Sequence, residues 1–134
     1  WGAELKYSRQ KIAGTTIENL DFGDLIDRYK PKNGDFWYLD PPYFIATDKG
    51  DYYQHNFTAE DHIRLKEKVD DINKGGGKFM VSYDYRDEVY DLYKEYNVIT
   101  IDLKYQGATD ENRLKKRKEY LILNYEPVNQ TSLF

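Results

Sequence analysis

Four consecutive residues, Asp40, Pro41, Pro42 and Tyr43, have the clearest potential for chemistry in this sequence of 134 residues. The two prolines fix the backbone and remove two amide donors, so the carbonyl groups there point outward without competing hydrogens. The Asp40 carboxylate and the Pro41 carbonyl can then accept both hydrogens of an exocyclic amino group, while Tyr43 stacks on the attached ring. A rigid turn after a buried strand is the purely structural alternative.

This arrangement suits methyl transfer to the nitrogen of an aromatic amine. The nitrogen lone pair is delocalised into the ring, and hydrogen bonds from its two protons to oxygen acceptors return electron density to it. Attack on a methylsulfonium centre then requires mainly alignment and electrostatic stabilisation. We therefore expect no metal: the sequence has no cysteine and no His/Asp/Glu cluster with metal-ligand spacing. His62 lies on the apolar stripe of a predicted helix, which favours a packed side chain over a ligand.

The composition, with 40% hydrophobic and 33% charged residues, is typical of a globular domain. No apolar run approaches the roughly 20 residues that a membrane-spanning helix needs. A net charge of −4 argues against nucleic-acid binding through the overall field. Residues 104–118, however, contain six basic and two acidic residues. Such a segment can hold phosphates at one edge of the molecule, although a solvated loop is the simpler interpretation.

Alternating strands and helices must position these residues. Apolar strands are predicted at 36–39, 78–83, 98–103 and 120–124, with a short β-prone run at 15–18, and helices at 21–29, 59–74 and 87–96. The alternation predicts an α/β fold: a mostly parallel sheet, an antiparallel final strand pair and helices on both faces. Ligands bind such sheets beyond the carboxyl ends of the strands. The chemistry is therefore expected just after Leu39, Val81 and Leu103, and near the start of the helix after Glu18.

The order of these segments resembles the Dam-like (D12 class) adenine-N6 DNA methyltransferases. Residues 36–43, Phe-Trp-Tyr-Leu-Asp-Pro-Pro-Tyr, resemble the catalytic tetrapeptide region of that family. Residues 16–22, Thr-Ile-Glu-Asn-Leu-Asp-Phe, resemble the segment that precedes it, and residues 79–84 and 119–125 resemble its later strands. The matches cover roughly residues 10–125, and the resemblance implies a partial Rossmann-like methyltransferase fold.

The resemblance also implies a substrate and roles for individual residues. Double-stranded DNA would be methylated at adenine N6, and the four residues Asp40, Pro41, Pro42 and Tyr43 would bind and activate the adenine. The base must first be flipped out, because an amino nitrogen inside a duplex cannot meet a methyl donor in line. Further contacts to DNA are expected from Tyr53, His55, Tyr105, Arg113, Lys115 and Lys116, besides Tyr43.

S-adenosylmethionine is the methyl donor that the resemblance implies. Asp21 and Phe22 would contact its adenine moiety, and Asp40 would lie near the methyl group. A helix N-cap is the alternative role for Asp21. The glycine-rich segment Phe-x-Gly-x-Gly, which the family uses for the methionine part of the donor, does not precede residue 15. We therefore expect a carboxy-terminal portion that binds the donor negligibly by itself, with an N-terminal portion or a partner chain supplying that segment.

Three regions are predicted. Residues 1–14 would end a target-recognition region, residues 15–125 would form the carboxy-terminal part of the catalytic domain, and residues 126–134 would form an extended tail. The tail resembles the peptides with which DNA-processing proteins dock to sliding clamps, with Gln130, Leu133 and Phe134 as anchors. An ordinary tail is the alternative.

Two other functions stay open. One is guanine-N2 methylation of ribosomal RNA, where a similar Asp-Pro-Pro-aromatic turn occurs. The other is a non-catalytic portion that binds DNA or a clamp. For a methyltransferase of restriction-modification type, we expect a location in the cytoplasm of a prokaryotic or phage-infected cell, near the nucleoid and away from membranes.

Overall fold

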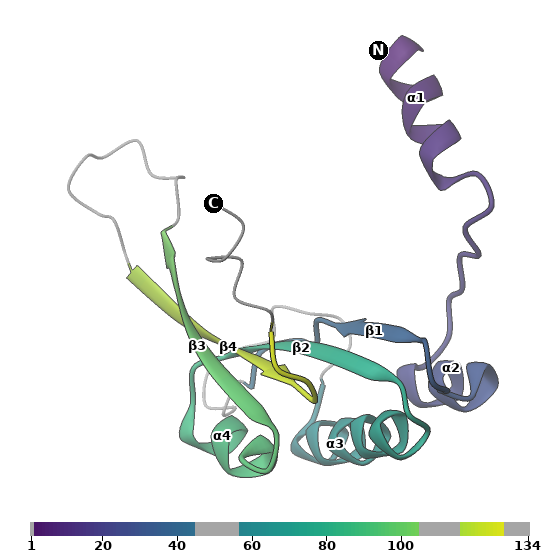
Figure 1. The fold of residues 1–134 in the computed structure, drawn as a ribbon. Helices are drawn as coiled ribbons and strands as arrows, with labels where there is room; N and C mark the ends of the chain where they lie inside the picture. Colours follow the sequence, from purple (N-terminus) through teal and green to yellow (C-terminus); the bar gives the residue numbers. More distant parts are fainter. Residues whose placement is uncertain (1, 45–56, 105–115, 128–134) are drawn as a thin grey trace.

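A computed structural model of the chain describes residues 2–44, 57–104 and 116–127. Helices and strands alternate along most of these residues (Figure 1). The helices are α1 (Gly2–Ile12), α2 (Phe22–Tyr29), α3 (Ala59–Lys74) and α4 (Asp87–Tyr93), and the strands are β1 (Phe36–Leu39), β2 (Lys78–Asp84), β3 (Asn97–Lys104) and β4 (Lys116–Leu123). None of the described helices is long and apolar enough to span a membrane.

The four described strands form one mixed sheet in the order β1-β2-β4-β3. β1 and β2 pair in parallel, whereas β4 pairs antiparallel with both β2 and β3. Consequently β1, β2 and β3 run in the same direction and β4 alone is reversed. The predicted α/β fold with an antiparallel final strand pair is confirmed. The sequence did not show that the last strand inserts between β2 and β3.

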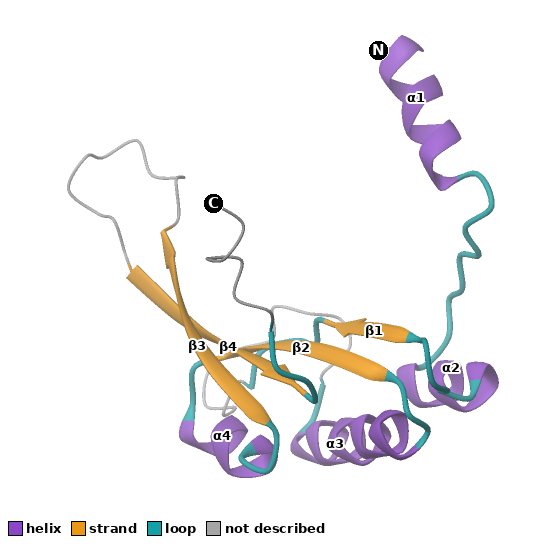
Figure 2. Cartoon of the chain, in the orientation of Figure 1, coloured by secondary structure: helices purple, strands orange, loops and turns teal. Residues whose placement is uncertain are grey.

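One hydrophobic core lies between the sheet and its helices. Helices α2, α3 and α4 lie along the same face of the sheet (Figure 2), and their apolar side chains meet alternate residues of the strands. The core side chains from the sheet include Phe79, Val81, Tyr83, Tyr120 and Ile122, all buried. Helices on both faces were expected, but the helices packed against the described sheet cover only one.

The face of the sheet opposite the helices is more open and more polar at one end. Phe36 and Tyr38 of β1 are 57% and 60% exposed there, because side chains of a strand alternate between its two faces. The registers Tyr38↔Met80 and Ser82↔Leu121 place Ser82 of β2 on the same face. This face therefore carries polar side chains from neighbouring strands at the carboxyl end of β1.

Capping side chains fix the beginnings of two helices as the sequence predicts. Thr58 and Asp61 form a reciprocal capping box at the start of α3. Asp21 caps α2, with its Oδ1 accepting a hydrogen bond from the Gly23 amide at 2.9 Å. The N-cap role considered for Asp21 is thus confirmed, and it places Phe22 in the first turn of α2.

Several predicted boundaries are wrong. Residues 15–18 form no strand, and α4 ends at Tyr93, one turn early. β4 begins at Lys116, so Arg117 and Lys118 lie in a strand and not in a basic loop. Pairing with β3 out to Lys104↔Lys116 extends both strands beyond their apolar residues. Local hydrophobicity cannot reveal this extension, because the backbone hydrogen bonds of a ladder do not depend on side-chain polarity.

Candidate active site

The predicted catalytic residues directly follow β1 at its carboxyl end. Asp40 is exposed, and its Oδ1 accepts a hydrogen bond of 2.7 Å from the Ser82 hydroxyl of β2. The parallel register Leu39↔Val81 brings Asp40 and Ser82 together, because Asp40 directly follows Leu39 and Ser82 directly follows Val81. Asp40 and Ser82 therefore lie just beyond Leu39 and Val81, at the strand ends where ligands bind sheets of this kind.

The side chain of Tyr43 is positioned by β4. Its hydroxyl donates a hydrogen bond of 2.8 Å to Oε1 of Glu119, and the guanidinium of Arg117 lies 4.4 Å from the centre of its ring. Glu119 pairs with Asp84 across the β2–β4 ladder, which brings it to the carboxyl end of β2, near the tetrapeptide. A hydroxyl anchor and a stacked cation together hold the ring plane.

The backbone after Tyr43 is anchored to β2. The amide of Phe44 donates a hydrogen bond of 2.9 Å to Oδ1 of Asp84, a carboxylate that is 7% exposed. The other oxygen of Asp84 accepts a bond of 2.7 Å from Nε of Arg86. A buried carboxylate with two charge-assisted partners is a strong anchor. Asp40 and Asp84 thus attach both ends of the tetrapeptide region to the same strand.

A row of aromatic rings connects this region to the start of α2. The ring of Phe22 lies 5.7 Å from that of Phe57, and Phe57 lies 4.6 Å from the ring of His62. His62 in turn lies 4.4 Å from Phe44, between centroids. These contacts place Phe22 and the tetrapeptide in one contiguous region, although the two segments are apart in the sequence.

His62 is the buried centre of this aromatic row. Its Nδ1 lies 2.5 Å from the hydroxyl of Tyr83, and only 2% of the residue is exposed. The prediction that this histidine is packed is confirmed. Desolvation lowers the pKa of His62 below its ordinary value, while the nearby carboxylates of Asp84 and Asp61 oppose this effect.

The lowered pKa of His62 makes stability depend on pH. In the unfolded chain His62 takes up a proton near about pH 6.5, whereas the buried ring does so only at lower pH. The unfolded state then binds more protons, so stability falls as the pH drops below about 6.5. We expect the urea concentration at the unfolding midpoint to decrease when the pH is lowered from about 7.5 to about 5.5. This decrease should be smaller in His62→Phe. Equal pH dependence in both proteins would contradict this prediction.

Arg64 of α3 binds the carboxylate of Asp21. Its NH1 and NH2 donate to the two oxygens of Asp21 at 2.6 and 2.9 Å, and NH2 also lies 3.1 Å from Oδ1 of Asp61. The guanidinium carbon lies 4.1 Å from the centre of the Phe22 ring. The hydrogen bonds from Arg64 lower the pKa of Asp21 to about 2. Asp21 and Phe22 therefore bind the same planar group, the guanidinium of Arg64: Asp21 accepts its hydrogen bonds and the ring of Phe22 packs against it.

The sequence model of the D12 class N6 adenine-specific DNA methyltransferases matches residues 2–106, which is more than half of the chain. The chain belongs to this family. The match includes both Asp21 and the tetrapeptide.

Three relatives that the chain resembles are named as methyltransferases or as a modification methylase. The chain is 27% identical to the type II methyltransferase M1.LlaDCHI of Lactococcus lactis subsp. cremoris over 70% of this chain and 34% of the relative. It is 31% identical to the modification methylase StsI of Streptococcus sanguinis, over 87% of this chain and 19% of the relative. For the type II methyltransferase M.MjaIII of Methanocaldococcus jannaschii, the identity is 28% over 76% of this chain and 37% of the relative. The chain thus spans between about a fifth and two fifths of the length of these relatives.

Several residues predicted for this D12 methyltransferase chain lie outside the described residues, so their roles stay predictions. They are Tyr53, His55, Tyr105, Arg113 and Lys115 among the expected DNA contacts, and Gln130, Leu133 and Phe134 of the tail. Lys116 begins β4. Within the described residues, no group of three or more His, Asp or Glu side chains could hold a metal ion.

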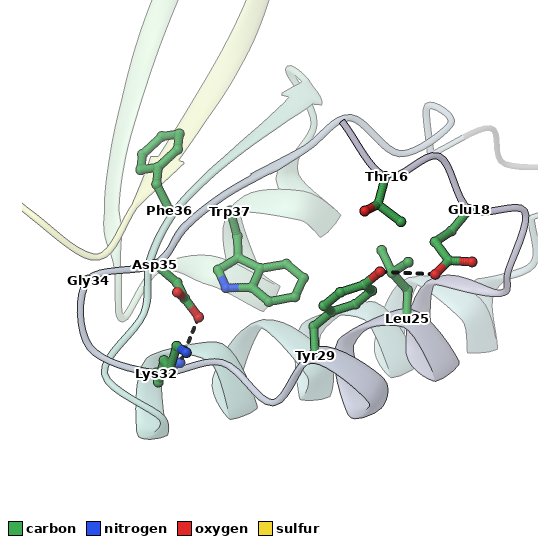
Figure 3. A pocket seen from close by; sticks show the side chains of 9 residues that line it. All are labelled: Thr16, Glu18, Leu25, Tyr29, Lys32, Gly34, Asp35, Phe36 and Trp37. Atoms are coloured by element: carbon green, nitrogen blue, oxygen red, sulfur yellow. Dashed lines mark hydrogen bonds between the residues drawn. The ribbon is translucent and has the colours of Figure 1, made fainter. Parts of the chain in front are cut away.

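A separate hollow lies at the opposite end of β1 from the catalytic tetrapeptide of the family. It has a volume of about 720 Å³ and is lined by the segment before α2, by α2 itself, by the turn before β1 and by the first residues of β1 (Figure 3). Trp37 and Tyr29 form its wall, and the Tyr29 hydroxyl donates to Glu18 at 2.9 Å. None of the lining residues is one that the sequence predicts for catalysis or donor binding.

Four residues that surround the tetrapeptide in this structure are missing from the predicted site. They are Ser82, Asp84, Arg117 and Glu119. Ser82 and Asp84 could have been found from the sequence, because they lie just beyond Val81, where a strand end is predicted to adjoin the site. Arg117 was included only in the basic segment. Glu119 could not be found, since its proximity depends on the β2–β4 register.

Proposed function

We propose that the intact protein is a site-specific DNA methyltransferase that methylates N6 of an adenine flipped out of the duplex. The observation that carries this proposal is the Asp-Pro-Pro-Tyr segment at the carboxyl end of β1, with Asp40 and Tyr43 both held in place by neighbouring strands. Membership of the D12 family supports it. The relatives named as type II or modification methyltransferases support a restriction-modification context.

In this proposal the tetrapeptide grips the amino group of the target base. The Asp40 carboxylate and the Pro41 carbonyl accept its two hydrogens, which raises electron density on the nitrogen and aligns its lone pair. Tyr43 stacks on the purine, and stacking of this kind contributes roughly 1–3 kcal/mol per base. A base that stacks on the side covered by Arg117 displaces the guanidinium, which can then bind a neighbouring phosphate.

S-adenosylmethionine, when bound, supplies an electrophilic methyl group on a sulfonium centre. Asp21 and Phe22 fit its adenine moiety, because a carboxylate beside an aromatic ring can accept from the amino group while the ring packs on the purine. They already hold a planar group with N–H donors, that of Arg64. We propose that an N-terminal portion or a partner chain supplies the segment for the methionine part.

Arg64 competes with the donor for Asp21 in this proposal. Both carboxylate oxygens accept from Arg64, so an incoming amino group has to replace one of these bonds. Exposed ion pairs contribute about 0.2–1 kcal/mol, which corresponds to at most about a fivefold change in affinity. We expect Arg64→Gln in the intact protein to bind S-adenosylhomocysteine about twofold to fivefold more tightly, measured by calorimetry.

Lys68→Gln is the matched control for Arg64→Gln. Lys68 also lies on α3 and pairs with α2, its Nζ being 2.5 Å from Asp27, but it does not bind Asp21. Its substitution should leave the affinity unchanged. Weaker binding by Arg64→Gln alone would contradict competition and would indicate that Arg64 contacts the donor directly.

Labelled methyl transfer tests the proposed function. The intact protein is incubated with tritiated S-adenosylmethionine and either unmethylated genomic duplex DNA or ribosomal RNA, and the modified base is identified by mass spectrometry. We expect N6-methyladenine in DNA. N2-methylguanine in RNA would support the alternative enzyme, and no transfer to either substrate would support a non-catalytic DNA- or clamp-binding role.

Other contacts belong to the same proposal. Basic and aromatic side chains of residues 44–57 and 104–118 would contact the DNA around the target base, and residues 1–14 would end a target-recognition region. Gln130, Leu133 and Phe134 would dock to a sliding clamp. Deletion of residues 130–134 without loss of clamp pull-down would contradict the docking. A cytoplasmic location near the nucleoid would follow from a chromosomal DNA substrate.

A further inference from the structure

Ser82 is a hydroxyl placed against the carboxylate of Asp40. It is only 8% exposed, lies on the central strand β2, and donates from Oγ to Oδ1 of Asp40 at 2.7 Å. Its neighbours Val81 and Tyr83 point into the core. The polar face of β2 therefore presents this hydroxyl at the point where β1 ends and the tetrapeptide begins.

A second hydroxyl determines the direction of this hydrogen bond. The Tyr38 hydroxyl lies 3.2 Å from Oγ of Ser82, and either of the two atoms could be the donor by geometry alone. A serine hydroxyl has one proton, and a carboxylate is the stronger acceptor for it. Ser82 therefore donates to Asp40 and accepts from Tyr38. The three groups form a chain in which each proton has a defined acceptor.

We propose that Ser82, supported by Tyr38, is a positioning residue that orients the Asp40 carboxylate for the amino group of the target base. With Oδ1 held by Ser82, rotation of the carboxylate about its χ2 angle is restricted and Oδ2 is directed to a fixed point. A carboxylate on an exposed turn otherwise samples several orientations, only some of which accept from the amino group. The inference rests on the proposed function, because it assigns Ser82 a part in the same reaction.

The expected effect is on the chemical step. Pre-orientation of a reacting group acts on kcat, and misplacement of about 1 Å can lower a rate about 100-fold. We expect Ser82→Ala in the intact protein to lower kcat about 10- to 100-fold. The KM for S-adenosylmethionine and the Kd for duplex DNA should change less than about twofold. Ser82→Thr keeps the hydroxyl and should restore most of kcat, while Tyr38→Phe should lower kcat only a few-fold.

Thr100→Ala is the matched control for Ser82→Ala. Thr100 is an exposed hydroxyl residue on β3 of the same sheet, and its strand does not adjoin β1. The control should keep wild-type kcat and thermal stability. Fluorescence of 2-aminopurine at the target position reports base flipping and should stay at the wild-type level in Ser82→Ala, since Tyr43 is held separately by Glu119.

The outcomes separate this inference from the proposed function. If the wild-type protein transfers no methyl group, the proposed function is wrong, regardless of the activities of the variants. An active wild type with an equally active Ser82→Ala would overturn the positioning role. That role would also be overturned if Ser82→Ala loses thermal stability and DNA affinity in proportion to its activity, or if Ser82→Thr stays as slow as Ser82→Ala, because only a structural role would then account for the loss.

Discussion

Replacing Asp40 by alanine should lower methyl transfer by the intact protein by about 100-fold to 1,000-fold or more, with little change in stability. Asp40 is exposed, so its removal creates no cavity in the core. The loss falls on the transition state, where the carboxylate stabilises developing positive charge on the amino group. Removal of one preorganised electrostatic group from an active site typically costs 100-fold to 1,000-fold in kcat. Single-turnover transfer of a labelled methyl group measures this step directly.

Asp102→Ala provides the comparison for Asp40→Ala. Asp102 is an exposed carboxylate on β3, paired with Lys118 in the sheet register and away from β1. Its substitution makes the same change in net charge and should leave transfer within about twofold of wild type. Asp40→Asn, which keeps the shape but not the charge, should be nearly as slow as Asp40→Ala. Wild-type turnover by Asp40→Ala would refute the assignment of the site.

His62→Ala should destabilise the fold by about 2–4 kcal/mol. The substitution removes a buried ring that packs against both Phe44 and Phe57, and truncations of large core side chains cost amounts of this order. It also removes the hydrogen-bond partner of the buried Tyr83 hydroxyl, and a buried polar group without a partner lowers the stability of the fold. Urea unfolding of wild type and variant at neutral pH, with unchanged m-values, measures the difference.

Ile63→Ala distinguishes loss of the packed ring from a general effect on α3. Ile63 is the next residue of the same helix and is 51% exposed. Its truncation should cost less than about 1 kcal/mol, since surface substitutions rarely cost more. Similar losses in the two variants would show that the buried ring of His62 contributes no more to stability than an exposed side chain of the same helix. The prediction would then be wrong.

The features that the sequence predicted correctly depend on neighbouring residues. Thr58 and Asp61 are three positions apart, and their capping box needs only the first turn of α3. The strand at Phe36–Leu39 is bounded by its own turn residues, and the tetrapeptide that follows it is contiguous. The buried position of His62 follows from the helical spacing of His62, Leu65 and Val69.

The contacts that the sequence did not predict join residues distant along the chain. Glu119 reaches Tyr43 across 76 positions, and Arg64 reaches Asp21 across 43. A register shift of one residue would turn Glu119 toward the helices, so its role depends on a pairing that side-chain patterns of one strand do not specify. Arg64 looked like any exposed helix residue. Its guanidinium acquires a role only because α2 and α3 pack side by side.

The position of β4 determines when the described sheet can form during synthesis. β2 and β3 are consecutive strands in the chain, yet they share no ladder, because β4, which follows both in the sequence, lies between them. Until residues 116–123 leave the ribosome, β3 has no neighbour in the described sheet, and Tyr43 lacks the hydrogen bond to Glu119. Strand pairing of this non-local kind is slow. A nascent chain therefore carries residues 40–43 before it carries the strand that supports Tyr43, and a chain that stopped before residue 116 would lack both β4 and that hydrogen bond.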